Sequence, residues 1–141
     1  MRGFTLIEMI VVVAVIAIVA SIAYPPYQDY ITRTRRTEAK TLLLELASKL
    51  ERCFIEYNAY NHEDCPLQHE DTVNSPQGYY TVEVEIPNAS TFTLSAIPKG
   101  AHAKDKCGKF VLKHNGEVSV PDATSDMGDT AEKKLNNCWN R

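Results

Sequence analysis

The chain has 141 residues, which allows one compact domain and one additional segment rather than several domains. Its net charge of −3 excludes the strongly basic balance of many nucleic-acid-binding proteins. The sequence has no phosphate-cradling glycine loop, nucleophile elbow or HExxH pattern, so nothing in it supports catalysis.

The first predicted element is an almost wholly apolar stretch from Phe4 to Tyr24. A helix of these 21 residues rises about 31 Å, which is enough to cross the hydrocarbon core of a bilayer. Glu8 is the one carboxylate in the stretch. Because a carboxylate in hydrocarbon is costly unless something pairs with it, Glu8 is a candidate functional residue.

An ordinary secretory signal peptide is an alternative interpretation, with Ser21-Ile22-Ala23 as its cleavage site. Glu8 would then lie inside a normally uncharged segment, and the helical pattern continues past Tyr24, so we prefer a membrane-spanning helix. A plain single-span anchor is also possible but leaves Glu8 without a role.

A second half-helix is predicted from residue 28 to 57, after Pro25-Pro26, where the loss of backbone donors should kink or locally break the helix. Apolar residues recur there every three or four positions, which is typical of a helix with one buried face. This stripe consists of Ala39, Leu42, Leu43, Leu46, Ala47, Leu50, Phe54 and Tyr57. We therefore predict one long helix, Phe4 to Tyr57, with Asn58 as its stop.

The polar segment between the two halves carries Arg33, Arg35 and Arg36. A solvated collar is the simplest interpretation, and contact with anionic lipid headgroups or with acidic groups of an adjacent subunit is the alternative. By charge alone these arginines favour a cytoplasmic side, but the cysteines that follow indicate an oxidising compartment. We expect the N-terminus in the cytoplasm and the bulk of the chain outside.

Residues 58–78 are predicted to form a loop, because the helical period is lost and turn-forming residues dominate. Four antiparallel strands are predicted over residues 79–120, beginning with alternating apolar residues from Tyr80 to Ile86 and from Phe92 to Ala96. The third covers 109–113 and the fourth 117–120. Such short connections favour a meander whose apolar face packs on the helix stripe, giving an α+β fold.

Two turns are expected between these strands. Pro87-Asn88 should reverse the chain after the first strand, and Asn115-Gly116 predicts a type I′ hairpin turn. The remaining tail, residues 121–141, is polar and is predicted to be a loop.

The four cysteines permit three pairings. We choose Cys53–Cys65 and Cys107–Cys138, because each pair closes a local loop that lacks a core of its own. Pairings that link the helix end to the tail remain open alternatives. Each disulfide would stabilise the fold by about 3–4 kcal/mol through restriction of the unfolded chain.

The run Gly3-Phe4-Thr5-Leu6-Ile7-Glu8 resembles the class III signal of type IV pilins and type II secretion pseudopilins. The resemblance implies cleavage after Gly3 by prepilin peptidase, N-methylation of Phe4, and a role for Glu8 in filament assembly. We expect Glu8 to pair with the amine of Phe4, of its own or the next subunit, because such a pair is strong in apolar surroundings. Pro25 lies in a segment that also resembles the family, and it is carried over as an assembly residue.

The rest of the chain resembles type IVa pilins, with the PilE-type minor pilins of Gram-negative bacteria as the nearest likeness. Asp105-Lys106-Cys107-Gly108 and Cys138-Trp139 resemble the family's disulfide-bounded C-terminal region, here 107–138. The resemblance implies the type IV pilin fold: a leader at 1–3, a membrane and filament-core half-helix at 4–27, and a globular domain at 28–141.

The same resemblance implies a single-pass inner-membrane protein that is later assembled into an extracellular pilus for twitching motility, adhesion or DNA uptake. Its partners would be other pilin subunits, prepilin peptidase, the inner-membrane assembly platform and membrane lipid. Minor pilin is the first interpretation. A major pilin, a type II secretion pseudopilin and a soluble periplasmic binding domain remain alternatives.

Two possible metal sites are considered and set aside, and no cofactor is expected. His62, Asp64, Cys65 and His69 are close in sequence, but an oxidised Cys65 would leave only weak zinc ligands. Asp122, Asp126 and Asp129 do not have the spacing of an EF-hand calcium loop.

A basic cluster surrounds the third predicted strand and is composed of Lys99, Lys104, Lys106, Lys109 and Lys113. Some minor pilins bind incoming DNA, and lysines of this kind make phosphate contacts. The acidic net charge and the few aromatic residues nearby argue against DNA as a partner, so we expect a solvated strand face.

Overall fold

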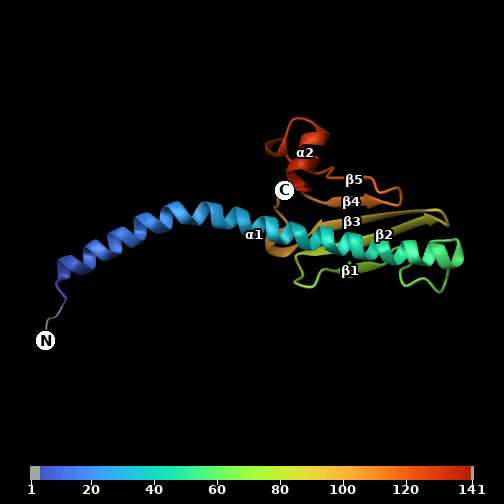
Figure 1. Ribbon diagram of the computed structural model, residues 1–141, viewed down its shortest axis with the longest axis horizontal. Helices are drawn as coiled ribbons and strands as arrows, with labels where there is room; N and C mark the ends of the chain where they lie inside the picture. The colour runs from blue at the N-terminus through green and yellow to red at the C-terminus, as the bar shows by residue number, and fades with distance from the viewer. Residues whose placement is uncertain (1–3, 141) are drawn as a thin grey trace. The chain divides into compact units, whose positions relative to one another are not determined.

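The structure is a computed structural model that describes residues 4–140. The chain divides into two compact units, one ending at Thr34 and the other beginning at Arg35. Helix α1, Leu6–Tyr57, contributes its first part to one unit and its second part to the other (Figure 1).

The first unit is the apolar part of α1. Its described side chains from residue 6 to residue 30 are all exposed, so nothing in this single chain covers them. Among residues 4–140, α1 alone is long and apolar enough to cross a membrane. The helix assignment continues through residues 25–26, and the local break that we predicted there is not present.

The second unit packs the amphipathic part of α1 on an antiparallel sheet. The strands are β1 (Thr72–Asn74), β2 (Tyr80–Asn88), β3 (Thr91–Pro98), β4 (Phe110–Lys113) and β5 (Val118–Ser119). They lie side by side in chain order as a meander (Figure 1). The predicted four-stranded sheet therefore gains a fifth strand at its edge.

Strand β1 lies inside the segment that we predicted to be a loop. It pairs with β2 through Thr72↔Glu83 and Val73↔Val82. A single apolar residue cannot show the alternation by which strands are recognised, so pairing with an existing strand, rather than local sequence, forms β1.

The core lies between α1 and the inner face of the sheet. The helix stripe supplies Leu43, Leu46 and Leu50, and each of these side chains is almost fully buried. The facing residues from β2, β3 and β4 are Tyr80, Val82, Val84, Phe92, Leu94, Ala96 and Phe110. Complete burial of one such aliphatic side chain stabilises a fold by about 1.5–3 kcal/mol, so this stripe fixes the helix to the sheet.

Both predicted turns differ in detail. Strand β2 continues to Asn88, and a register shift between Glu85 and Asn88 accommodates Pro87, which has no N–H for the ladder. Gly116 has φ +79°, but Asn115 does not have the positive φ that a type I′ turn requires. Residues 114–116 instead form a three-residue loop that ends in a left-handed glycine.

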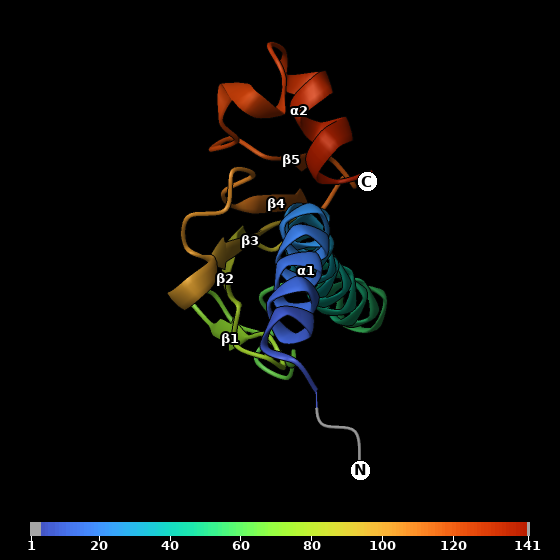
Figure 2. The same cartoon turned by 90° about the vertical axis from the view of Figure 1, so that its left-hand side faces the viewer.

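We predicted that the tail would be a loop throughout, and this is wrong. It contains the short 3-10 helix η2 (Ser125–Met127) and helix α2 (Ala131–Cys138). The Thr130 side chain caps α2 by accepting a hydrogen bond from the Lys133 N–H. Figure 2 shows α2 beside β5, at the edge of the sheet opposite β1.

Candidate functional site

The connection between β3 and β4 concentrates positive charge, and we call residues 99–109 the basic loop. It carries Lys99, Lys104, Lys106 and Lys109, and its one carboxylate is Asp105. Lys104 and Lys106 are exposed, and Lys99 and Lys109 are half-buried. A 3-10 helix, η1 (Gly100–His102), begins directly after Lys99.

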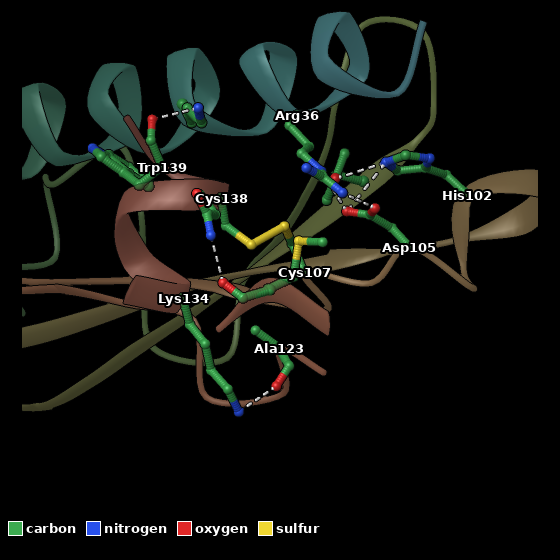
Figure 3. The surroundings of a disulfide bond; sticks show 12 residues. Arg36, His102, Asp105, Cys107, Ala123, Lys134, Cys138 and Trp139 are labelled. Carbon is green, nitrogen blue, oxygen red and sulfur yellow. Dashed lines mark hydrogen bonds and ion pairs between the residues drawn. A yellow bond between two sulfur atoms is a disulfide. The ribbon is translucent and has the colours of Figure 1, made fainter. Parts of the chain in front are cut away.

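Asp105 turns inward and holds the loop on α1. The Arg36 guanidinium donates two hydrogen bonds to it, from Nε to Oδ2 at 2.9 Å and from Nη2 to Oδ1 at 2.5 Å. The Asp105 side chain is 2% exposed and that of Arg36 is 10% exposed, so the pair is nearly dry. Figure 3 shows Arg36 reaching from the helix to Asp105 with His102 on the other side. A bidentate pair of this kind fixes orientation as well as distance.

His102 provides a second attachment beneath the loop. Its Nε2 lies 2.9 Å from the Tyr80 hydroxyl and 3.7 Å from Asp105 Oδ2. Burial lowers the pKa of His102 below 6.5, and the carboxylate of Asp105 only partly opposes this effect. Burial likewise raises the pKa of Tyr80, with the Asp105 charge adding to it. The histidine is therefore neutral at pH 7, and the phenol remains protonated.

The disulfide Cys107–Cys138 ties the end of the loop to α2 (Figure 3). Next to it, Gly108 has φ +61°, and a Cβ at this position would lie 2.6 Å from the Cβ of Asp122. The Thr124 N–H donates to the Lys106 carbonyl at 2.8 Å. The basic loop is thus attached to α1, to the sheet and to the tail.

The five predicted lysines do not all belong to this loop. Lys113 lies at the far end of β4 and pairs with Glu117 at 3.1 Å. Lys99 Nζ donates to Asn74 Oδ1 at 2.5 Å, and Lys106 Nζ pairs with Asp126 at 2.9 Å on the open surface. An exposed pair of that kind is worth about 0–1 kcal/mol, so Lys106 can exchange its partner at little cost.

The three arginines, interpreted as a solvated collar or alternatively as contacts to lipid or another subunit, have separate environments. Arg36 is buried against Asp105, so neither interpretation holds for this residue. Arg35 lies over the Tyr79 ring, with its Cζ 4.3 Å from the ring centroid. Arg33 is exposed, and its predicted contacts stay a prediction.

A second loop has the opposite charge, and we call residues 58–71 the acidic loop. It carries Glu63, Asp64, Glu70 and Asp71 and no Lys or Arg. Cys53–Cys65 ties it to the end of α1. With Cys107–Cys138, both disulfides have the pairing that we chose. Asn58, in the left-handed region at φ +53°, ends the helix as predicted.

A cavity of about 430 Å³ lies between α1 and the acidic loop, lined by residues that include Lys49, Arg52, Glu56 and Asp64. The candidate zinc ligands nearby have other contacts. Cys65 is in the disulfide, and His69 Nδ1 accepts from the Ile86 N–H at 2.9 Å. Within residues 4–140, no three potential metal ligands come together.

Glu8 has a local partner. The Glu8 N–H donates to Thr5 Oγ1 at 3.3 Å, and the Thr5 N–H donates to Glu8 Oε2 at 3.5 Å. This reciprocal arrangement is a capping box at the start of α1, and the spacing Thr-x-x-Glu could have predicted it. Gly3 lies outside the described residues, and Phe4 is exposed.

Three residues of the loop attachment were not predicted as functional. Asp105 and His102 stand among lysines, and Tyr80 opens a strand, so none of them has a sequence signal of its own. Arg36 was noticed only as a charge. Their proximity depends on how the sheet is laid on the helix.

Comparison with known proteins identifies two family models. One, described as type IV minor pilin ComP, DNA uptake sequence receptor, matches residues 25–111. The other, described as the prokaryotic N-terminal methylation motif, matches residues 1–24. No curated protein matches the chain.

A solved structure is also similar, a type IV pilin from Shewanella oneidensis determined at high resolution. It is 28% identical, has a TM-score of 0.51, and the match covers 66% of this chain and 94% of that chain. The predicted fold, a long N-terminal helix on an antiparallel sheet, is confirmed.

Proposed function

We propose that this chain, which belongs to the family of type IV minor pilin ComP proteins, DNA uptake sequence receptors, binds DNA through its basic loop. Membership makes it a pilus subunit rather than an enzyme, held in the inner membrane by its apolar helix before assembly and located in the pilus afterwards. Minor pilin was our first interpretation, and it is confirmed.

The family description corrects the weight that we gave to net charge. We argued against DNA because the chain as a whole carries −3. A polyanion, however, responds to the charge within about one Debye length, roughly 8 Å at physiological salt. The basic loop carries four lysines, and its one carboxylate is already neutralised by Arg36.

The observation that carries the proposal is that this loop is held in place while two of its lysines face outward. Arg36, Tyr80 and Cys138 hold Asp105, His102 and Cys107, whereas Lys104 and Lys106 are exposed. Because the backbone of the loop is already held, phosphate contacts cost only the freedom of the lysine side chains. Phosphate contacts fix a protein's position on the duplex and supply affinity that is independent of sequence.

The proposal includes the processing of the N-terminus. The methylation-motif match supports cleavage after Gly3 and methylation of Phe4. Residues 4–27 then form the filament-core half-helix, with Pro25 near its end, and residues 28–141 form the globular domain. In the filament, Glu8 would exchange its bond with Thr5 for the Phe4 amine of its own or the next subunit. Prepilin peptidase, other pilins and the assembly platform are the proposed partners.

The DNA proposal is tested with the full-length protein in detergent micelles. Anisotropy of a fluorescein-labelled duplex of mixed sequence gives the dissociation constant over a range of salt concentrations. For Lys104→Gln combined with Lys106→Gln, we expect weaker binding and a salt slope shallower by about 1.8, since each lost phosphate contact removes about 0.9.

The matched control combines Lys49→Gln, on the exposed side of α1, with Lys133→Gln, in α2. These changes remove the same charge and should leave the slope unchanged. An equal loss in both double variants would mean that DNA senses only total charge, and the assignment to the basic loop would fail.

A further inference from the structure

Asp105 connects the exposed lysines to the buried residues. It lies directly between Lys104 and Lys106, both exposed, while its own side chain is 2% exposed. Asp105 also joins two tight turns, because its N–H donates to the His102 carbonyl at 3.0 Å and its carbonyl accepts from the Gly108 N–H at 3.0 Å. The attachment of Asp105 therefore fixes the backbone that carries the two lysines.

Arg36 and His102, neither of which is proposed to contact phosphate, compete for the same carboxylate oxygen of Asp105. Arg36 Nε lies 2.9 Å from Asp105 Oδ2, and His102 Nε2 lies 3.7 Å from the same oxygen. In the neutral ring, Nε2 can accept the hydrogen bond of the Tyr80 hydroxyl, which lies at 2.9 Å. A protonated ring carries a hydrogen on Nε2, so Tyr80 can no longer donate to it and the ring draws toward Asp105.

The other charges around His102 limit how well the site accepts a proton. Asp105 and Glu38 favour the protonated ring, and Arg35 and Arg36 oppose it. The rings of Tyr79 and Tyr80 make edge-to-face contacts with the histidine ring, at centroid distances of 6.3 Å and 5.3 Å. Burial is the largest influence and lowers the pKa of His102. Protonation thus adds a second cation beside Arg36 in a nearly dry cluster with one carboxylate.

We infer that Arg36 and His102 are positioning residues for DNA binding, which hold the basic loop through Asp105, and that protonation of His102 releases this hold. The inference rests on the proposed function. It goes beyond that function because the buried His102, which cannot contact DNA, makes the affinity for DNA depend on pH.

The test compares the wild type with His102→Gln, both full-length in detergent micelles, by duplex anisotropy from pH 7.5 to pH 5.5 at constant salt. Glutamine can accept the Tyr80 hydrogen bond but does not titrate. The ratio of the wild-type dissociation constant to that of the variant should be near one at pH 7.5 and rise steadily as the pH falls to 5.5, because only the wild type can gain a proton at this position. His114→Gln, at an exposed histidine, should follow the wild type.

A second variant tests positioning without titration. Arg36→Lys keeps the charge but loses the bidentate geometry. We expect binding about three- to tenfold weaker with an unchanged salt slope, because no phosphate contact is lost. Arg52→Lys, an exposed position on the same helix, should not weaken binding.

Hydrogen exchange separates the failure of this inference from the failure of the proposed function. The Asp105 and Gly108 amides, which donate to the His102 and Asp105 carbonyls, should exchange faster at pH 5.5 in the wild type than in His102→Gln. DNA binding with a constant ratio would overturn the inference alone. Absence of DNA binding at every pH would overturn the proposed function, and the positioning role with it.

Discussion

The basic loop and the acidic loop are attached by similar means and carry opposite charge. Each is tied by a disulfide, Cys107–Cys138 for one and Cys53–Cys65 for the other. The basic loop has an additional buried ion pair with α1, and its anchor on the helix, Arg36, is about 26 Å from Cys53 at 1.5 Å per residue. That separation between the two anchors exceeds the Debye length, so the charges near Arg36 and those near Cys53 act on DNA largely independently.

The largest effect is expected when the ion pair between Asp105 and Arg36, which only the basic loop has, is broken. Asp105→Ala leaves the Arg36 guanidinium buried without its partner, which should lower the free energy of unfolding by about 3–5 kcal/mol. Chemical denaturation of the full-length protein in detergent measures this. Combining Asp105→Leu with Arg36→Met should recover much of the loss, and a double variant as unstable as Asp105→Ala would show that the charge was not responsible.

Removal of either disulfide should lower stability by a similar amount, but the effects on DNA binding should differ. Cys107→Ser with Cys138→Ser opens a link of 31 residues and should cost about 4 kcal/mol, whereas Cys53→Ser with Cys65→Ser opens 12 residues and should cost about 3 kcal/mol. Thermal unfolding measures both. Only the first double variant should also weaken DNA binding, so equal effects on affinity would remove the distinction between the loops.

Two glycines test how tightly the basic loop is seated. Gly108→Ala places a methyl group 2.6 Å from the Asp122 Cβ and requires a left-handed residue, so we expect a loss of about 2–3 kcal/mol. Gly116→Ala has the same backbone requirement but open space around it and should cost about 1–2 kcal/mol. Denaturant midpoints compare them, and equal losses would mean that the Asp122 contact yields easily.

The smallest predicted effect concerns alkaline pH and the acidic loop. Burial, followed by the hydrogen bond to Glu51, raises the pKa of Tyr60 to about 12. The stability contributed by the neutral phenol is therefore complete below pH 10 and lost as the pH rises through about 12. Phenolate absorbance, compared between the wild type and Tyr60→Phe, should show this late-titrating tyrosine. A variant with an unchanged titration curve would assign the late step elsewhere.

Features with a local period could be predicted from the sequence, and those created by tertiary contact could not. The helix stripe from Ala39 to Tyr57 and the alternation of β2 and β3 repeat along the chain. Val73 in β1 joins the sheet only because β2 offers it an edge, and α2 was hidden by the polarity of the tail, although Thr130 and the alanine, lysine and leucine after it favour a helix. The lysines of the candidate site can be identified directly in the sequence. Their scaffold is not, since Arg36 and Asp105 are 69 positions apart.

The contacts of the C-terminal segment also bear on how the domain matures during export. Cys53 can meet Cys65 once the helix end and the residues just after it have emerged from the membrane. Cys107 must wait for Cys138, and Lys40 donates to the carbonyl of Trp139, which lies 99 residues further along the chain. Vectorial emergence would therefore complete the acidic loop first and the basic loop last, so a subunit stalled during translocation would carry one disulfide and an unattached basic loop.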